Sequence, residues 1–351
     1  MKSEILRLLK ESEGYVSGQQ LCEQFQVSRT AVWKVVDQLK KEGYEIEAVP
    51  RKGYRLVESP DVLSEAELES LRSTKWAGKS IFVFKETDST NIQAKAGGEK
   101  GEPHGTLYVA ESQSAGRGRR GRRWESPAGE SIYMSLLLRP EFPPVKAPML
   151  TLVMALAVAR ALREQTGVDV QIKWPNDLVV QGRKICGILT EMSIEMTWIN
   201  YVVIGIGINV NQNEFPEELK DCASSLKMET GRRFRRSHLI AAVMEHFEMY
   251  YEQFLQEGSL AGLRKEYNEL LVNKDRQVKI LEPGNHYEAY ALLETLFDRK
   301  FPHLKIRAQE SFAGVNTDFR GARLDVYIEE DGSVQNIFAG EVSVRGIYGY
   351  T

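Results

Sequence analysis

Apolar side chains recur at helical spacing in three short segments near the start of the chain, which predicts three helices. The third segment follows Ser28, a suitable N-cap. Its expected buried positions are Ala31, Val32, Val35, Val36 and Leu39. Only Gln26 and Val27 separate it from the segment before, which is typical of a helix-turn-helix. Residues 44–49 and 54–57 then alternate around a short turn, so a two-stranded wing is predicted next.

The other face of the third predicted helix carries polar and aromatic side chains that suit DNA recognition. Its N-terminal end would face base edges, and the turn of the wing would bring basic side chains to phosphates. The DNA-binding candidates are Ser28, Arg29, Thr30, Trp33, Lys34, Arg51 and Lys52. Residues 1–57 hold ten basic and eight acidic side chains, a net charge of only +2, so we expect DNA binding to need a dimer. The alternative is a winged helix that serves protein contacts.

A different pattern begins after residue 80. Ser59-Pro60-Asp61 ends the wing, and Ser64 and Glu67 have capping-box spacing for a short helix to about Arg72. Longer strands are then expected at residues 80–84, 106–111, 131–139, 168–173, 184–191 and 201–209, and helices at 147–166 and 238–257. This arrangement predicts an α/β domain with a sizeable sheet.

Composition narrows the class of protein. The 351 residues are 42% hydrophobic and 27% charged, which is ordinary for a soluble protein of two or three domains. The net charge of −3 gives no general attraction to nucleic acid or membrane. The three cysteines are far apart, the first residues do not resemble a signal peptide, and no apolar run approaches the roughly 18 residues of a membrane span. We therefore expect a cytoplasmic protein without a disulfide framework.

The most informative stretch is a cationic loop that directly follows an expected strand. Residues 116–123, called here the arginine–glycine loop, contain five arginines and three glycines. Glycines let the backbone approach a ligand closely, and arginines offer planar sets of donors to phosphate and carboxylate oxygens. The loop is therefore a candidate to close over a nucleotide. The alternative is a disordered tract that binds nucleic acid, which its position within a strand-rich domain disfavours.

A second polar cluster lies beside an expected hairpin. Lys173-Trp-Pro-Asn-Asp177 leads into the turn, and Lys184 follows it. The groups that could together hold an anionic substrate and a divalent cation are Lys173, Asn176, Asp177 and Lys184. The alternative is a strand-ending turn with solvated lysines.

Two further polar segments each follow or end an expected strand. Residues 87–91 supply several small hydrogen-bonding groups, and Gly205-x-Gly207-x-Asn209 ends a strand with a polar side chain. The second segment lacks the remainder of a dinucleotide fingerprint, and the sequence has no GxxxxGK[ST] phosphate loop. Neither a Rossmann domain nor a P-loop is therefore supported.

The sequence resembles the biotin–protein ligase family in five segments that keep the family's order and spacing. They are Asp88–Asn91, the arginine–glycine loop, Lys173–Asp177, Arg183-Lys184 and Gly205-x-Gly-x-Asn209. The N-terminal winged helix resembles that of the members that are also biotin repressors, so the resemblance covers nearly the whole chain. It implies a reaction in two steps. Biotin and ATP give biotinyl-5′-adenylate and pyrophosphate, and the biotinyl group then passes to a lysine of a biotin carboxyl carrier protein.

The resemblance also implies residue roles and partners. Arg119 and Lys184 would be catalytic, shielding the reacting anions together with Mg²⁺, for which Asp177 is the candidate ligand. The biotin-binding candidates are Ser89, Thr90, Asn91, Gln113, Arg117, Gly118, Arg119, Lys184 and Gly187. The candidates for binding ATP and the adenylate are Arg119, Arg120, Arg122, Trp124, Lys173, Asn176 and Asn209. As a repressor, the adenylate-bound protein would form a homodimer and bind operator DNA.

Three domains follow from these expectations: a winged helix-turn-helix at 1–62, a mixed-sheet ligase domain at 63–272, and a small SH3-like β-barrel at 273–351. The fold class is therefore α/β (α+β) and multidomain. Val278–Leu281 and Phe338–Gly346 resemble the barrel, whereas residues 292–312 depart from the family pattern. We interpret that departure as an inserted loop or short helix.

Two other functions remain open at this point. The chain could be a ligand-responsive transcription factor without catalysis, although the cationic residues that adenylation needs are present. It could also be a lipoate–protein ligase, which has a similar central fold, although the winged helix and the arginine–glycine loop favour biotin.

Overall fold

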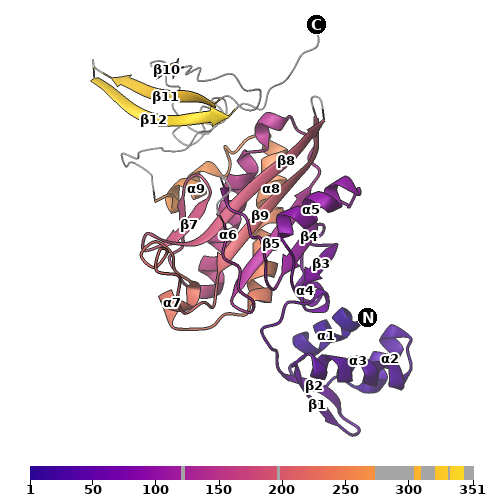
Figure 1. Cartoon of the computed structure of the whole chain (residues 1–351). Coiled ribbons are helices and arrows are strands. Elements are labelled where there is room, and N and C mark those ends of the chain that lie inside the picture. The colour runs from indigo at the N-terminus through magenta and orange to yellow at the C-terminus, as the bar shows by residue number, and fades with distance from the viewer. Residues whose placement is uncertain (120–122, 196–197, 273–303, 310–320, 331–332, 344–351) are drawn as a thin grey trace. The chain divides into compact units, whose positions relative to one another are not determined.

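The structure is a computed structural model that describes residues 1–119, 123–195, 198–272, 304–309, 321–330 and 333–343 (Figure 1). The chain forms two compact units, Met1–Gln256 and Glu257–Thr351. The first unit contains both the predicted DNA-binding module and the predicted α/β domain. The domain borders predicted after residues 62 and 272 stay predictions.

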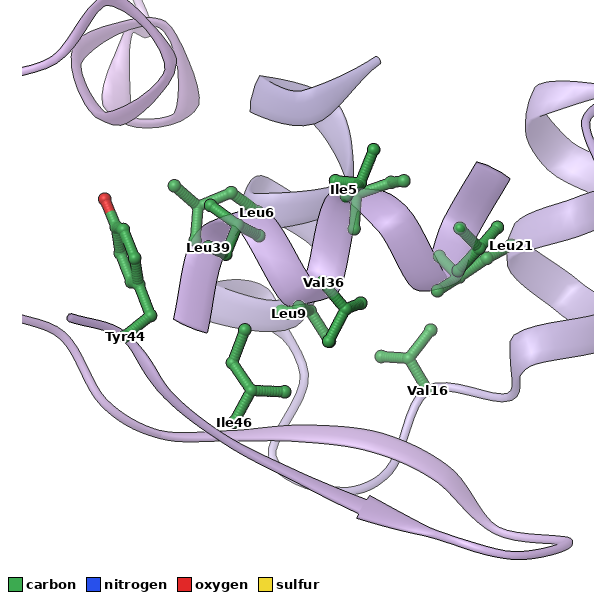
Figure 2. Close-up of a cluster of buried hydrophobic side chains, with 11 residues drawn as sticks. Ile5, Leu6, Leu9, Val16, Leu21, Val36, Leu39, Tyr44 and Ile46 are labelled. Carbon is green, nitrogen blue, oxygen red and sulfur yellow. The ribbon is translucent and has the colours of Figure 1, made fainter. Parts of the chain in front are cut away.

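A winged helix-turn-helix occupies the first 58 residues, as predicted. Its elements are α1 (Lys2–Glu11), α2 (Gly18–Phe25), α3 (Arg29–Lys41), β1 (Glu45–Val49) and β2 (Gly53–Glu58). The Ser28 hydroxyl caps α3 by accepting a hydrogen bond from the Ala31 N–H. Figure 2 shows that apolar side chains from the helices and from β1 gather in one cluster between the helices and the hairpin. The module therefore has a hydrophobic core of its own.

The centre of the first unit is a mixed sheet of seven strands in the order β3-β4-β5-β9-β8-β7-β6. The strands are β3 (Ile81–Phe84), β4 (Thr106–Ala110), β5 (Ser131–Leu138), β6 (Gln171–Lys173), β7 (Asp177–Val180), β8 (Arg183–Glu195) and β9 (Trp198–Asn209). β3 and β4 pair in parallel, and the other neighbours are antiparallel. β6 begins later than predicted because Val168 and Val170 form a tight turn, in which the Val170 N–H donates to the Val168 carbonyl.

Helices cover both faces of this sheet. α5 (Thr90–Glu99) contacts β4, β5 and β9, and α6 (Met149–Thr166) contacts β6, β7 and β8. Asn91 of α5 bonds to Glu191 of β8, whereas Thr151 of α6 bonds to the adjacent Thr190. Because successive strand residues point to opposite faces, the two helices lie on opposite sides. The described residues of this unit also form α4 (Glu65–Leu71), η2 (Pro144–Lys146), α7 (Leu226–Thr230) and α8 (Arg236–Glu257).

The sequence did not predict α5, because its apolar pattern is weak and it contains two glycines. Gly97 lies against the Tyr108 hydroxyl and Gly98 against the Tyr201 ring, where a Cβ atom would stand 1.8 and 2.7 Å from them. The glycines therefore let the helix approach two tyrosines of the sheet closely.

α6 corrects the expectation that no segment is apolar enough to cross a membrane. By length and composition alone, residues 144–166 pass that test. In the structure, 67% of the most apolar window is buried, and the helix packs on the sheet. A helix that is apolar on all sides is a core helix when protein surrounds it, so α6 belongs to the interior of a soluble domain.

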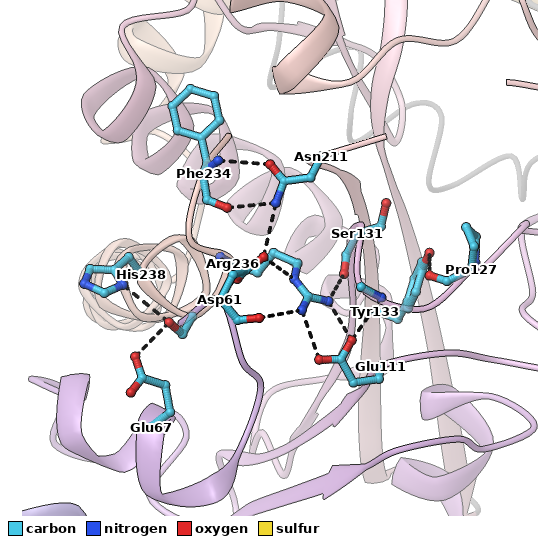
Figure 3. Close-up of polar contacts among 12 residues, drawn as sticks. Asp61, Glu67, Glu111, Pro127, Ser131, Tyr133, Asn211, Phe234, Arg236 and His238 are labelled. Carbon is cyan, nitrogen blue, oxygen red and sulfur yellow. Dashed lines mark hydrogen bonds and ion pairs between the residues drawn. The ribbon is translucent and has the colours of Figure 1, made fainter. Parts of the chain in front are cut away.

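A buried arginine joins the segment after the wing to the sheet (Figure 3). Arg236, at the start of α8, is 1% exposed and forms ion pairs with Asp61 (3.1 Å) and Glu111 (2.8 Å). It also donates to the carbonyl of Ser131, at the start of β5. Burial alone would lower the pKa of this guanidinium, but the hydrogen bonds and charges of the two carboxylates outweigh it and raise the pKa.

A buried carboxylate, Glu67 of α4, holds the winged helix to α8. It pairs with Lys10 of α1 at 2.7 Å and accepts hydrogen bonds from Tyr44 and from Ser237 of α8. The predicted cap of α4 is confirmed on one side, since Ser64 accepts from the Glu67 N–H. The Glu67 side chain therefore connects the winged helix, through Lys10 and Tyr44, to Ser237 of α8.

The second unit contains α9 (Arg264–Leu270) and an antiparallel sheet of β10 (Leu304–Gln309), β11 (Gly321–Glu330) and β12 (Ser333–Ser343). β10 falls within residues 292–312, so the interpretation of a loop or short helix is wrong for residues 304–309. Their apolar and polar residues alternate with the period of a strand. Residues 292–303 and 310–312 lie outside the described residues, as does Val278–Leu281.

Replacing Arg236 by Met should lower the free energy of unfolding by about 3–5 kcal/mol, because Asp61 and Glu111 lose their shared partner. Urea denaturation followed by circular dichroism would measure this. Lys41→Met is the control, since that side chain is 76% exposed beside Asp37 and its loss should cost less than about 1 kcal/mol. Equal effects of the two changes would contradict the importance of the buried ion.

Candidate active site

Three glycines leave part of the sheet without side chains. They lie in two adjacent rows on one face, Tyr133–Gly207–Gly187 and Ser135–Gly205–Leu189, across β5, β9 and β8. Because glycine has no Cβ, another part of the chain can lie directly on the strands here. Gly187, Gly205 and Gly207 therefore form a patch of sheet surface without side chains, called here the floor of the site.

Two side chains cover this floor. The Trp124 indole lies on Gly207 and Gly187, where a Cβ would stand only 2.6 and 2.9 Å from the ring. The Asn91 amide lies on Gly205, where a Cβ would stand 2.0 Å from Oδ1. Trp124 follows the arginine–glycine loop and Asn91 belongs to the start of α5, so the glycines bring these two segments together.

The start of α5 keeps the Ser89 hydroxyl out of helix capping. Ser89 holds the N-cap position but makes no side-chain capping bond among the described residues. Asp88 instead accepts from the Ser89 N–H at 2.6 Å and from the Gln93 amide at 3.1 Å. Burial opposes ionisation, but these bonds and one from Thr87 lower the pKa of the Asp88 carboxyl. An anionic Asp88 suits the positive end of a helix.

Gln113 connects α5 to the segment after the arginine–glycine loop. Its Oε1 accepts from the N–H and hydroxyl of Thr90 at 2.9 and 3.3 Å, and its Nε2 donates to Ser126 at 2.9 Å. Ser135 supports this arrangement from inside the sheet, with its Oγ 2.8 Å from Thr90 Oγ1 and 2.6 Å from Asn91 Oδ1. Three of the predicted biotin-binding residues, Thr90, Asn91 and Gln113, are therefore held in one hydrogen-bonded network.

A pocket opens between this network and Trp124. The predicted residues that line it are Ser89, Thr90, Asn91, Gln113, Arg117, Trp124 and Gly187. Six other lining residues were not predicted to bind a ligand: Tyr133, Met134, Leu189, Gly205, Ile206 and Gly207. These six come from buried strands, where an apolar run does not reveal which residues border a pocket; the glycines were the available signal.

Cationic groups lie beside the pocket. The Lys184 ammonium stands 5.3 Å from the centre of the Trp124 ring and pairs with Asp177 at 2.6 Å. Arg119 donates to Asn176 Oδ1 at 3.0 Å, and the Asn176 amide in turn donates to the Ile188 carbonyl. The two motifs that were separate in the sequence, the arginine–glycine loop and Lys173–Asp177, therefore meet here.

Other predicted ligand-binding residues are placed elsewhere or not described. Lys173 is exposed, in register with Asp177 on the next strand. Asn209 is 5% exposed and donates to the Ser224 carbonyl at 3.0 Å. Gly118 belongs to the arginine–glycine loop outside the pocket lining. Arg120 and Arg122 lie outside the described residues.

The DNA-binding candidates all lie on the surface of the winged helix. Those of the third helix form its N-terminal end, and Trp33 stands out because 56% of this large side chain is exposed. Arg51 and Lys52 are exposed in the turn between β1 and β2. An exposed aromatic ring next to basic groups fits a surface that meets a partner.

The part of the chain that the structure describes shows no magnesium site made by protein side chains alone. The described residues contain no group of three or more His, Cys, Asp or Glu side chains that could hold a metal ion. Asp177 is a single carboxylate, and it is paired with Lys184. Mg²⁺ is often held by one carboxylate together with substrate phosphates, so these residues fit that mode of binding. All three cysteines are free thiols.

Comparison with known proteins agrees with this geometry and defines the class of protein. Residues 83–209 match the biotin/lipoate A/B protein ligase family, and residues 2–55 match a helix-turn-helix domain. Biotin protein ligase from Aquifex aeolicus, solved in complex with biotin and ATP, has a similar structure, with 30% identity and a TM-score of 0.52. The similarity covers 74% of this chain and 95% of that one.

Curated relatives match both the winged helix and the α/β domain, over nearly the whole chain. The bifunctional ligase/repressor BirA of Bacillus subtilis is 42% identical over 261 residues, 74% of this chain and 80% of its own length. That of Escherichia coli is 32% identical over 345 residues, 97% and 96% of the two chains. The chain belongs to the family of bifunctional biotin–protein ligases and repressors.

Replacing Gly207 by Ala should displace the Trp124 ring from the sheet, because the new methyl group would stand 2.6 Å from it. We expect a loss of about 1–3 kcal/mol in the free energy of unfolding and stronger quenching of tryptophan fluorescence by acrylamide. The extra quenching should vanish in a Trp124→Phe background. Gly14→Ala is the control, since nothing lies within 4 Å of its Cβ position. Unchanged quenching in Gly207→Ala would disprove the contact.

Proposed function

We propose that biotin binds in the pocket beside Trp124, reacts there with ATP, and is then transferred to a lysine of a biotin carboxyl carrier protein. The observation that carries this proposal is the juxtaposition of a neutral hydrogen-bonding network with a cationic margin. Ser89, Thr90 and Gln113 offer neutral groups on one side, and Lys184 stands on the other beside Trp124. Biotin has a neutral polar ring system at one end and a carboxylate at the other, so it matches this polarity.

Lys184 and Arg119 are the proposed catalytic residues. In the first step, a carboxylate oxygen of biotin bonds to the α-phosphorus of ATP, and the bond from that phosphorus to the pyrophosphate oxygen breaks. Both reactants are anions, so their approach needs positive groups nearby. Lys184 would bind the carboxylate and then the phosphate of the mixed anhydride. Arg119, oriented by Asn176, would stabilise the charge that develops on the phosphate oxygens.

The arginine–glycine loop would close over the intermediate and exclude water. Arg117, Gly118 and Gly187 are proposed to contact biotin. Arg120, Arg122, Trp124, Lys173, Asn176 and Asn209 are proposed to contact ATP and the adenylate. Mg²⁺ would be held mainly by ATP phosphates, with Asp177 as the nearby carboxylate, and would neutralise phosphate charge.

The second step needs no nucleophile from this chain. The amine of the carrier lysine attacks the carbonyl carbon of the mixed anhydride, AMP leaves, and an amide bond remains. The three antiparallel strands of the second unit support the proposal that residues 273–351 form an SH3-like barrel. The reaction also fits a cytoplasmic location, where ATP and newly made carrier protein are present.

We further propose that the adenylate-bound chain forms a homodimer and represses transcription from an operator with two half-sites. The winged helix has only a small net positive charge, which favours recognition by two copies. The adenylate would shift the chain from monomer to homodimer only if it binds the homodimer more tightly than the monomer. DNA would contact Ser28, Arg29, Thr30, Trp33, Lys34, Arg51 and Lys52.

Incubation with biotin, ATP, Mg²⁺ and a biotin carrier domain should add one biotinyl mass to the carrier, as measured by intact-mass spectrometry. Lys184→Ala should slow this addition by about 100-fold or more, because a transition-state cation is lost. Lys100→Ala, at an exposed lysine of the same domain, is the control and should keep the wild-type rate. No addition by the wild-type chain would refute the proposed reaction, and full activity of Lys184→Ala would refute the role of Lys184.

Selection from random duplex DNA should enrich a sequence with two half-sites when biotin, ATP and Mg²⁺ are present together. Trp33→Ala should reduce discrimination among sequences, whereas Arg51→Ala with Lys52→Ala should weaken binding to all of them and flatten its salt dependence. The control is the same selection with biotin but no ATP. Equal enrichment with and without ATP would contradict control of DNA binding by the adenylate.

A further inference from the structure

Ser126 is a buried hydroxyl that touches two parts of the proposed biotin site. It is 7% exposed and lies just after Trp124, at the end of the arginine–glycine loop. Its Oγ accepts from Gln113 Nε2 at 2.9 Å and donates to the Trp124 carbonyl at 3.0 Å. None of the family motifs quoted above includes Ser126.

The direction of each hydrogen bond in this chain of contacts follows from one backbone group. The Thr90 N–H can only donate, so the group of Gln113 that faces it at 2.9 Å must be the oxygen. The Gln113 nitrogen then faces Ser126, whose Oγ must accept. The Ser126 proton is thereby directed to the Trp124 carbonyl. The Thr90 N–H therefore sets which way the Gln113 amide points, and the Ser126 hydroxyl stabilises that orientation by accepting from Nε2.

Backbone contacts reinforce the same junction. The Gln113 N–H donates to the Ser126 carbonyl at 3.3 Å, and the Trp124 N–H donates to the Gly116 carbonyl at 3.0 Å. Gly116 leaves no space, since a Cβ there would stand 2.4 Å from the Trp124 carbonyl oxygen and 2.6 Å from Ser126 Oγ. The two ends of the arginine–glycine loop are thus closely packed, with the Ser126 hydroxyl between them.

We propose that Ser126 is a positioning residue for biotin: it orients the Gln113 amide in the pocket and holds the base of the arginine–glycine loop beside it. This inference rests on the proposed function of the pocket. Removing the hydroxyl leaves a buried Gln113 N–H without its acceptor, so the amide is held on one side only, by Thr90, and can shift from the position in which it faces biotin. Ser126 touches no reacting atom in this scheme, so it should affect biotin binding far more than turnover at saturation.

The test compares Ser126→Ala with Ser114→Ala in the carrier-biotinylation assay. Ser114 is an exposed serine of the same segment, and among the described residues its hydroxyl makes one long contact, 3.4 Å to the Thr87 carbonyl. Ser126→Ala should raise the KM for biotin by about tenfold and speed release of the adenylate, with kcat within about twofold of wild type. Ser114→Ala should leave all three unchanged. Ser126→Thr, which keeps the hydroxyl, should restore most of the biotin KM.

A double-mutant cycle separates positioning from simple structural support. If Ser126 acts through the Gln113 amide, Ser126→Ala should raise the KM little further in a Gln113→Met background. Additive effects, or an unchanged KM in Ser126→Ala, would overturn the proposal. If Ser126→Ala fails to fold, Ser126→Cys decides, because sulfur is a weaker acceptor of similar shape: a raised KM supports the proposal and a wild-type KM overturns it. A wild-type chain that adds no biotin would instead refute the proposed function.

Discussion

The fold of the first unit depends on the ion pairs of the buried Arg236 guanidinium. Removing such an ion from water costs several kcal/mol, so it can be 1% exposed only where oxygen atoms take its N–H donors. Asp61 provides them from the segment after the wing, and Glu111 from the end of β4. The segment that the sequence presents as a break between domains is therefore fixed to the sheet.

The ion pairs of Arg236 are also connected to the pocket, through Glu111. Glu111 also accepts from the Gly129 N–H at 3.1 Å, which holds the turn that leads into β5. Gln113 follows Glu111 closely in the chain, and Ser126 closely precedes Gly129. One carboxylate thus fixes both segments whose side chains, Gln113 and Ser126, meet beside the pocket. The pocket and the attachment of the DNA-binding module are built on one framework.

Periodic and local features could be predicted from the sequence, and long-range contacts could not. Ser28 and Ser64 were assigned as caps because capping depends on residues within one helical turn. The Arg236 pairs with Asp61 and Glu111 left no sequence signal, since the partners are separated by 175 and 125 residues. In the pocket, the residue types that suit biotin were evident from motifs. Its floor became clear only when strand register placed Gly187 beside Gly207.

Asp177 has a contact in the structure that its residue type and its motif did not predict. As a carboxylate beside two lysines it was expected to hold Mg²⁺, and in the structure it pairs with Lys184 at 2.6 Å. An anionic substrate that binds Lys184 must compete with Asp177 for the same ammonium group. If Lys184 binds the substrate as proposed, the Asp177 carboxylate would lose this partner and would be free to face a cation. The lysine and the metal would thus use this carboxylate in turn, so substrate binding and metal binding at this site should favour each other.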